Sequence, residues 1–150
     1  MVIFVEIKMD YRYGSHTVFK IEYHFVWVTK YRFHVLKGDI AIRVRELTRQ
    51  ICEAQEIQII KGAVSKDHVH VLLSAPPEIS PSEIMRRIKG RTARKLMEEF
   101  PELKKRYWGR HLWARGYFCA TVGDMTDEMI RQYLEHHFEQ SSVNTIGIET

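Results

Sequence analysis

Residues 57–75, with the sequence IQIIKGAVSKDHVHVLLSA, consist of two apolar runs on either side of the polar triplet Ser65-Lys66-Asp67. Both runs are rich in β-branched residues, which favour extended backbone in a sheet, so we predict strands over residues 57–64 and 69–75. A short polar connection of this kind is typical of a hairpin turn. The segment therefore predicts two neighbouring antiparallel strands, around which the rest of the chain is interpreted.

The elements outside this hairpin follow from the spacing of their apolar residues. In chain order they are a strand over residues 17–29, an amphipathic helix over 40–54 capped by Asp39, a helix that begins at Ser80 or Ser82, a strand over 116–122 and a helix over 126–139. The order is β-α-β-β-α-β-α. Its first six elements match the split β-α-β pattern, so we predict an α+β, ferredoxin-like fold. In that fold, helices cover one face of an antiparallel sheet, and here a C-terminal helix is added.

The chain has the length of one domain, because its 150 residues contain no repeat and no linker rich in Pro, Gly or Ser. We expect a single domain over residues 1–150, with an N-terminal extension over 1–16 and a C-terminal tail over 141–150. No apolar run approaches the roughly 18 residues that cross a membrane. Residues 1–10 contain acids and no small-residue cleavage site, unlike a signal peptide, so we expect a cytoplasmic protein.

The most informative local pattern is His68-Val69-His70 in the second strand of the hairpin. Alternate side chains of a strand share a face, so the two imidazoles point the same way and can reach one cation. The alternative is a pair of half-exposed histidines with no ligand. Histidine-triad nucleotide hydrolases would need a third histidine at position 72, where this chain has Leu72.

The predicted final helix carries Tyr133 and His137, which are four residues apart and therefore neighbours on one stripe. A tyrosine nucleophile suits phosphodiester chemistry, provided that something activates its phenol or stabilises charge on the phosphate. A metal bound by His68 and His70 would polarise that phosphate, and His137 is the candidate third ligand. The alternative is that the stripe packs against the core.

Basic residues gather after Pro81 and again near position 110. Candidate phosphate contacts are Lys30, Arg32, Arg86, Arg87, Lys89, Arg91, Arg94, Lys95 and Arg110. Aromatic residues are interleaved with cations over residues 104–115, as on surfaces that bind nucleic acid. Two alternatives stay open at this point: the basic helix is a solvated face, or Trp108 and Trp113 belong to the core.

Four segments together resemble one known family, the single-tyrosine HUH transposases of IS200-like insertion sequences. They are residues 23–32 (YHFVWVTKYR), 66–72 (KDHVHVL), 112–118 (LWARGYF) and 130–135 (IRQYLE). The resemblance implies a DNA transposase that binds hairpins at the ends of its element. It also implies cleavage and rejoining of single-stranded DNA through a 5′-phosphotyrosine link to Tyr133. Mg2+ or Mn2+ would be held by His68, His70 and His137. A homodimer would share its active sites between subunits.

The sequence departs from the family pattern at one ligand position, because His137 stands where members commonly have Gln. An imidazole there would favour Mn2+ or another softer ion. Two other functions remain as alternatives. One is a domesticated, repeat-associated transposase relative, and the other is a noncatalytic module that binds single-stranded nucleic acid.

Overall fold

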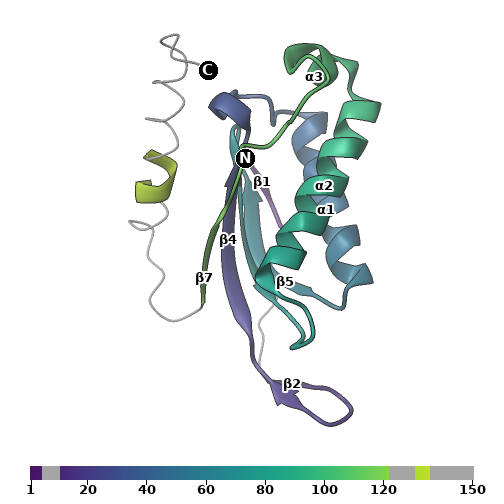
Figure 1. Cartoon of the computed structure of the whole chain (residues 1–150), viewed down its shortest axis with the longest axis vertical. Helices are drawn as coiled ribbons and strands as arrows, with labels where there is room; N and C mark the ends of the chain where they lie inside the picture. The colour runs from purple at the N-terminus through teal and green to yellow at the C-terminus, as the bar shows by residue number, and fades with distance from the viewer. Residues whose placement is uncertain (5–10, 122–130, 136–150) are drawn as a thin grey trace.

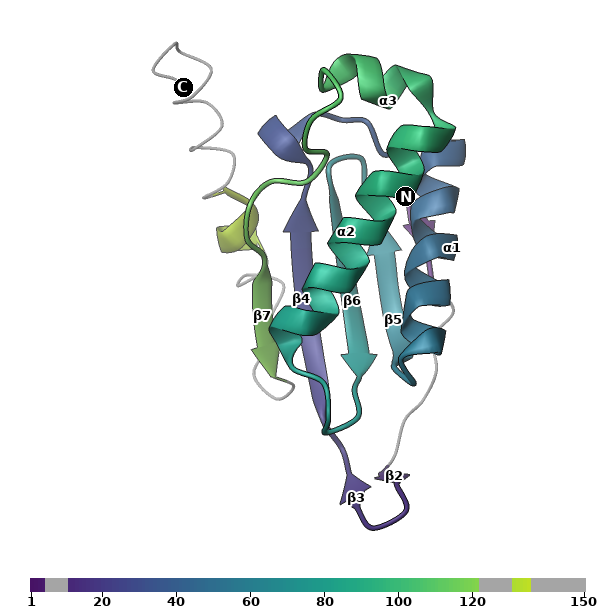
Figure 2. The ribbon, with the colours of Figure 1, turned by 45° about the vertical axis from the view of Figure 1, so that its right-hand side comes forward.

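Five strands form one antiparallel sheet in the computed structural model, which describes residues 1–4, 11–121 and 131–135 (Figure 1). The spatial order is β1-β5-β6-β4-β7. The strands are β1 (Val2–Ile3), β4 (Glu22–Val28), β5 (Gln58–Val64), β6 (His68–Ser74) and β7 (Phe118–Thr121). The two long helices, α1 (Asp39–Ala54) and α2 (Pro81–Glu99), lie over one face of this sheet (Figure 2). The predicted antiparallel sheet with helices on one face is thus confirmed.

The hairpin at the centre of the sequence analysis is present as β5 and β6. Gln58 pairs with Ser74 and Val64 with Val69, and the Ser65 N–H donates to the His68 carbonyl oxygen at 2.8 Å across the turn. β6 also pairs along its whole length with β4. It is therefore an interior strand of the sheet, which explains its nearly continuous burial.

The strand predicted over residues 17–29 is divided in two. Its first part, β3 (Val18–Phe19), pairs with β2 (Arg12–Tyr13) in a separate two-stranded sheet, and its second part is β4. The Gly14 N–H donates to the Thr17 carbonyl oxygen at 2.6 Å and closes that small hairpin. The division depends on pairing partners, whereas β propensity runs through the whole segment.

The helices lie close to their predicted bounds. α1 spans Asp39–Ala54, but Gly38 is its N-cap, with a φ of 56°, and Asp39 lies in the first turn. α2 spans Pro81–Glu99, and the Ser80 hydroxyl accepts a hydrogen bond from the Glu83 N–H at 3.2 Å. A short α3 (Pro101–Arg106) and strand β1 were not predicted. No helix among the described residues is long and apolar enough to cross a bilayer.

The core lies between the sheet and the two long helices. From β4 and β6 it receives Phe25, Trp27, Val69, Val71 and Leu73, all fully buried. These residues alternate with His68, His70 and His24, which belong to the opposite sheet face. One face of the central strands therefore packs against the helices, and the other carries the three histidines among buried apolar residues such as Val26 and Val28.

Residues 131–135 are helical and lie on the sheet face opposite α1 and α2 (Figure 1). The rest of the helix predicted over 126–139, and the tail over 141–150, lie outside the described residues. Within the described turn, the ring of Tyr133 approaches that of Phe118 in β7, with centroids 5.4 Å apart. Phe118 pairs with Val26, which in turn pairs with His70, so Tyr133 is on the histidine face of the sheet.

Candidate active site

Three histidines from two adjacent strands lie on the open face of the sheet. The structure places His68 and His70 there on β6, both half-buried, and His24 beside them on β4. His24 Nδ1 is 3.2 Å from His70 Nε2, and their rings are stacked with centroids 5.5 Å apart. Burial, followed by the charge of Lys61, lowers the pKa of His24. Sequence reasoning missed His24, although its place in the segment 23–32 was a usable signal.

Asp67 orients His68 from the turn that precedes β6. Asp67 Oδ1 lies 2.8 Å from His68 Nδ1. This contact selects the tautomer in which Nδ1 carries the proton and donates to the carboxylate. That tautomer carries its lone pair on Nε2, the nitrogen then able to ligate a metal. A carboxylate behind a ligating histidine is a common arrangement in metal sites.

Arg32 holds the same carboxylate from the other side. Its Nε and Nη2 donate to Asp67 Oδ2 at 2.9 and 2.6 Å, and the two side chains are only 16% and 11% exposed. Burial raises the pKa of Asp67, but the hydrogen bonds from His68 and Arg32 and the charge of Arg32 outweigh it and lower the pKa overall. Asp67 is therefore ionised at neutral pH, and its carboxylate accepts hydrogen bonds from both Arg32 and His68.

Arg32 also contacts the segment that carries the candidate nucleophile. Its Nη1 donates to the Leu134 carbonyl oxygen at 2.6 Å, one residue after Tyr133. This guanidinium thus joins the support of His68 to residues 131–135. Arg32 was predicted to contact phosphate, and in the structure it makes three hydrogen bonds to the protein.

Tyr133 is half-buried against the sheet. Burial raises its pKa to about 12, against the opposing influence of the Arg32 charge. The phenol is therefore protonated at neutral pH and must lose its proton during any attack. His137, the candidate third ligand, lies outside the described residues.

The donor chemistry of this face fits a divalent transition metal. Imidazole nitrogens are common ligands of divalent transition metals, whereas Mg2+ prefers oxygen ligands. Among residues 1–4, 11–121 and 131–135, no three His, Cys, Asp or Glu side chains form a cluster that could hold a metal by themselves. The histidine pair therefore needs a donor from elsewhere in the chain, from a partner or from substrate.

The predicted basic residues fall into separate groups. On α2, Arg86 and Arg87 bind the partly exposed Glu83 at 2.5–2.9 Å and lower its pKa to about 2. A groove between α1 and α2 is lined by four arginines: Arg86, Arg87, Arg91 and Arg94. Lys95 lies 3.9 Å from Glu98. The solvated-face alternative and the phosphate-binding one both remain compatible with this helix.

Lys89 faces the protein rather than that groove. Its Nζ donates to the carbonyl oxygens of Ala114 and Gly116 at 2.9 and 2.7 Å, and burial lowers its pKa to about 8. It fixes the loop that leads into β7. Trp113, in the same loop, is a core residue, since its Nε1 donates to buried Thr92 at 2.9 Å.

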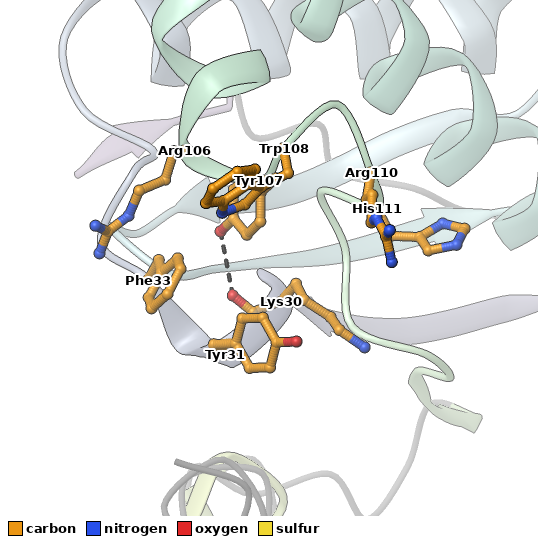
Figure 3. A pocket seen from close by; sticks show the side chains of 8 residues that line it. All are labelled: Lys30, Tyr31, Phe33, Arg106, Tyr107, Trp108, Arg110 and His111. Atoms are coloured by element: carbon orange, nitrogen blue, oxygen red, sulfur yellow. Dashed lines mark hydrogen bonds between the residues drawn. The ribbon is translucent and has the colours of Figure 1, made fainter. Parts of the chain in front are cut away.

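Lys30 and Arg110 come together at a cavity of about 500 Å3 (Figure 3). Two short segments form it: the turn η1 (Lys30–Arg32) with Phe33, and residues 106–111 at the end of α3. The Tyr107 hydroxyl donates to the Lys30 carbonyl oxygen at 3.1 Å and ties the two segments together. Trp108 is exposed at this cavity, whereas Trp113 is buried. Of the two tryptophans, only Trp113 therefore belongs to the core.

Comparison with known proteins identifies one family. The family model described as "Transposase IS200 like" matches residues 17–137. The ISDra2 transposase TnpA of Deinococcus radiodurans is 33% identical over 137 residues, covering 91% of this chain and 98% of that protein. The transposase for insertion sequence element IS200 of Salmonella typhimurium is 35% identical over 129 residues, covering 86% of this chain and 84% of that protein.

Solved structures agree. The crystal structure of a Deinococcus radiodurans R1 protein named as a transposase has a TM-score of 0.78 and 35% identity, covering 84% of this chain and 97% of that one. A REP-associated tyrosine transposase bound to a REP hairpin has a TM-score of 0.53 at 13% identity, covering 90% and 76%, and supports the fold alone. With a family model and relatives that span most of its length, the chain belongs to the IS200-like transposase family.

Proposed function

We propose that this transposase binds DNA hairpins at the ends of an insertion sequence and cleaves and rejoins single strands there, with Tyr133 as its nucleophile. The observation that carries the proposal is Arg32, which contacts both the support of His68 and the backbone of the tyrosine segment. One side chain thus links the two parts that such a reaction needs on a single face of the sheet.

The covalent step conserves the number of phosphodiester bonds. The Tyr133 phenol oxygen bonds to phosphorus and gives up its proton, while the bond from phosphorus to the 3′ oxygen breaks. The 3′ oxygen leaves and takes up a proton as a hydroxyl group, and the 5′ phosphate stays on the tyrosine. Attack by a 3′ hydroxyl on this link reverses the step, so rejoining needs no nucleotide cofactor.

His68, His70 and His137 are the proposed ligands of a divalent metal, Mg2+ or Mn2+. Bound there, the metal would polarise the scissile phosphate. Asp67 holds the His68 ring in the required tautomer. We further propose a homodimer in which the tyrosine segment of one subunit acts with the histidines of the other.

The experiment is a covalent-adduct assay with hairpin DNA labelled on the 5′ or the 3′ side of the cleavage point, in Mg2+ or Mn2+. Tyr133→Phe should abolish the adduct and keep DNA binding. Tyr13→Phe, the same change on the exposed β2–β3 hairpin, is the matched control and should leave the adduct unchanged. An equally abundant adduct in Tyr133→Phe would remove Tyr133 from the reaction.

Metal titration of the full-length protein tests the ligands separately. His68→Ala and His137→Ala should each weaken Mn2+ binding measured by calorimetry. Unchanged affinity in His137→Ala would exclude it as a ligand. If no variant and no wild-type preparation forms an adduct, while hairpin binding persists, the noncatalytic binding module replaces the enzyme as the better description.

A further inference from the structure

The cavity between η1 and residues 106–111 has a composition that the proposed cleavage chemistry does not use. Its floor is apolar, because Phe33 and the buried Tyr107 face each other there with ring centroids 5.5 Å apart. Lys30, Arg106 and Arg110 surround it, with the Arg106 guanidinium 3.9 Å from the centroid of the Phe33 ring. None of the described residues that line it is acidic (Figure 3). Aromatic surfaces bordered by cations suit a nucleotide, whose base stacks while its phosphate pairs with the charges.

Trp108 is the unusual member of this lining. It is 88% exposed, and within the described part of the chain its indole makes no hydrogen bond or ring contact. The chain's other tryptophans, Trp27 and Trp113, are buried and contact each other edge to face. A large aromatic side chain held in water at the mouth of a cavity has no packing role in this structure.

The backbone at Trp108 is also one that a bulky side chain rarely adopts. Tyr107 is the C-cap of α3, and Trp108 follows it with a φ of 58°, in the left-handed region. This first position after a helix C-cap is where glycine is normally favoured, because a side chain is unfavourable there. Tyr31, across the cavity, also has a left-handed φ, of 60°. Glu56 takes the same position after α1 with a φ of 57°, so at Trp108 the left-handed backbone supports a functional role only together with the exposed indole.

We propose that this cavity binds one unpaired nucleobase of the DNA strand, stacked on Trp108, with Lys30 and Arg110 at the adjoining phosphate. The inference rests on the proposed function for its ligand, single-stranded DNA. The cavity would be a second place where the protein contacts DNA, and the residues that form it are not those of the histidine face. Arg32 is in the same turn as Tyr31, and its side chain binds Asp67 next to the histidine face.

The test uses the indole itself as the reporter. Trp108 is the one exposed tryptophan of the three, so stacking of a base on it should quench the intrinsic fluorescence of the full-length protein. The titrant is a mixed-sequence single-stranded DNA oligonucleotide, and a blunt duplex of the same sequence is the control without unpaired bases. We expect saturable quenching by the single strand and little by the duplex. Equal responses, or none, would overturn the proposal.

Substitution separates a binding role from a structural one. Trp108→Gly should weaken single-strand binding by roughly 5- to 150-fold, the range of one lost base–aromatic stack. It should also leave the melting temperature unchanged or raised, because glycine fits the left-handed position. Trp108→Phe should retain part of the affinity. Unchanged affinity in Trp108→Gly, or a large loss of stability, would overturn the proposal.

Abasic substitution locates the base. Oligonucleotides that lack one base at a time should show a single position whose loss weakens wild-type binding but has no added effect on Trp108→Gly. The outcome is independent of the cleavage chemistry. Normal adduct formation without quenching refutes the base site alone, whereas quenching with an adduct that survives Tyr133→Phe refutes the assigned nucleophile alone.

Discussion

Replacing Arg32 with glutamine tests the support of the histidine face most directly. The change removes two hydrogen bonds to Asp67 Oδ2, of 2.9 and 2.6 Å, between side chains that are 16% and 11% exposed. It also removes the hydrogen bond from Nη1 to the Leu134 carbonyl oxygen. Asp67 would keep its hydrogen bond with His68 and the exposed His34 ring, whose Nε2 lies 3.7 Å from Oδ2. Loss of one partner from a buried ion pair costs about 3–5 kcal/mol, and because some solvent contact remains we expect the lower end, about 3 kcal/mol.

The pH dependence supplies a second signature. The pKa of Asp67 lies below its unfolded value of 3.8, so its ionised form stabilises the fold above about pH 4. This contribution is lost as the pH falls through the lowered folded-state pKa. In Asp67→Asn there is no such proton to take up, and the stability should fall less steeply below pH 4 than in the wild type.

The assay is urea unfolding followed by circular dichroism at pH 7 and at several values below pH 5. Arg43→Gln is the matched control, since Arg43 makes the same two-bond contact with Glu99 at 2.7 and 2.8 Å on the more exposed helix surface. That pair should contribute at most about 1 kcal/mol. The reasoning fails if Arg32→Gln lowers the free energy of unfolding no more than Arg43→Gln does. It also fails if the stability of Asp67→Asn falls as steeply below pH 4 as that of the wild type.

Three further substitutions test the fold around the site. Gly62→Ala should destabilise by about 1–3 kcal/mol in urea unfolding, because the added Cβ would lie 2.8 Å from a backbone oxygen and from two side chains; a neutral change would contradict this close approach. Ser80→Ala should cost about 1 kcal/mol by loss of the α2 cap, and an unchanged melting temperature would argue against that cap. Thr92→Val leaves the buried Trp113 N–H without its acceptor and should cost about 1–3 kcal/mol, whereas no loss would show that the hydrogen bond is unimportant.

The main sheet and long helices could be predicted because their signals are local. Alternation over residues 57–75 and helical spacing after Asp39 and Pro81 are properties of consecutive residues. The short strands β1 and β2 carry no such signal, since a strand of two residues is defined by its pairing, here of β1 with β5 and of β2 with β3. For the same reason the boundary between β3 and β4 was not visible in a continuous β-forming segment.

The candidate site shows the same limit at the level of side chains. Alternation was enough to place His68 and His70 together on one strand. The role of Arg32 was not predictable, because its partner Asp67 is 35 residues away and its orientation depends on a left-handed backbone, with a φ of 53°. Charge alone suggested a phosphate contact, and only the folded chain shows that the charge is already paired.

The turn that carries Arg32 explains how the histidine face and the aromatic cavity are held together. Thr29 anchors its start, with its N–H bonded to the Asp67 carbonyl oxygen at 2.9 Å and its hydroxyl bonded to the Phe33 carbonyl oxygen at 2.8 Å. Tyr107 binds the Lys30 carbonyl oxygen from the cavity side. These contacts offset the unfavourable left-handed backbone of the next two residues. The result is that Arg32 faces the histidines while its neighbours line the cavity, so one rigid turn fixes the position of both.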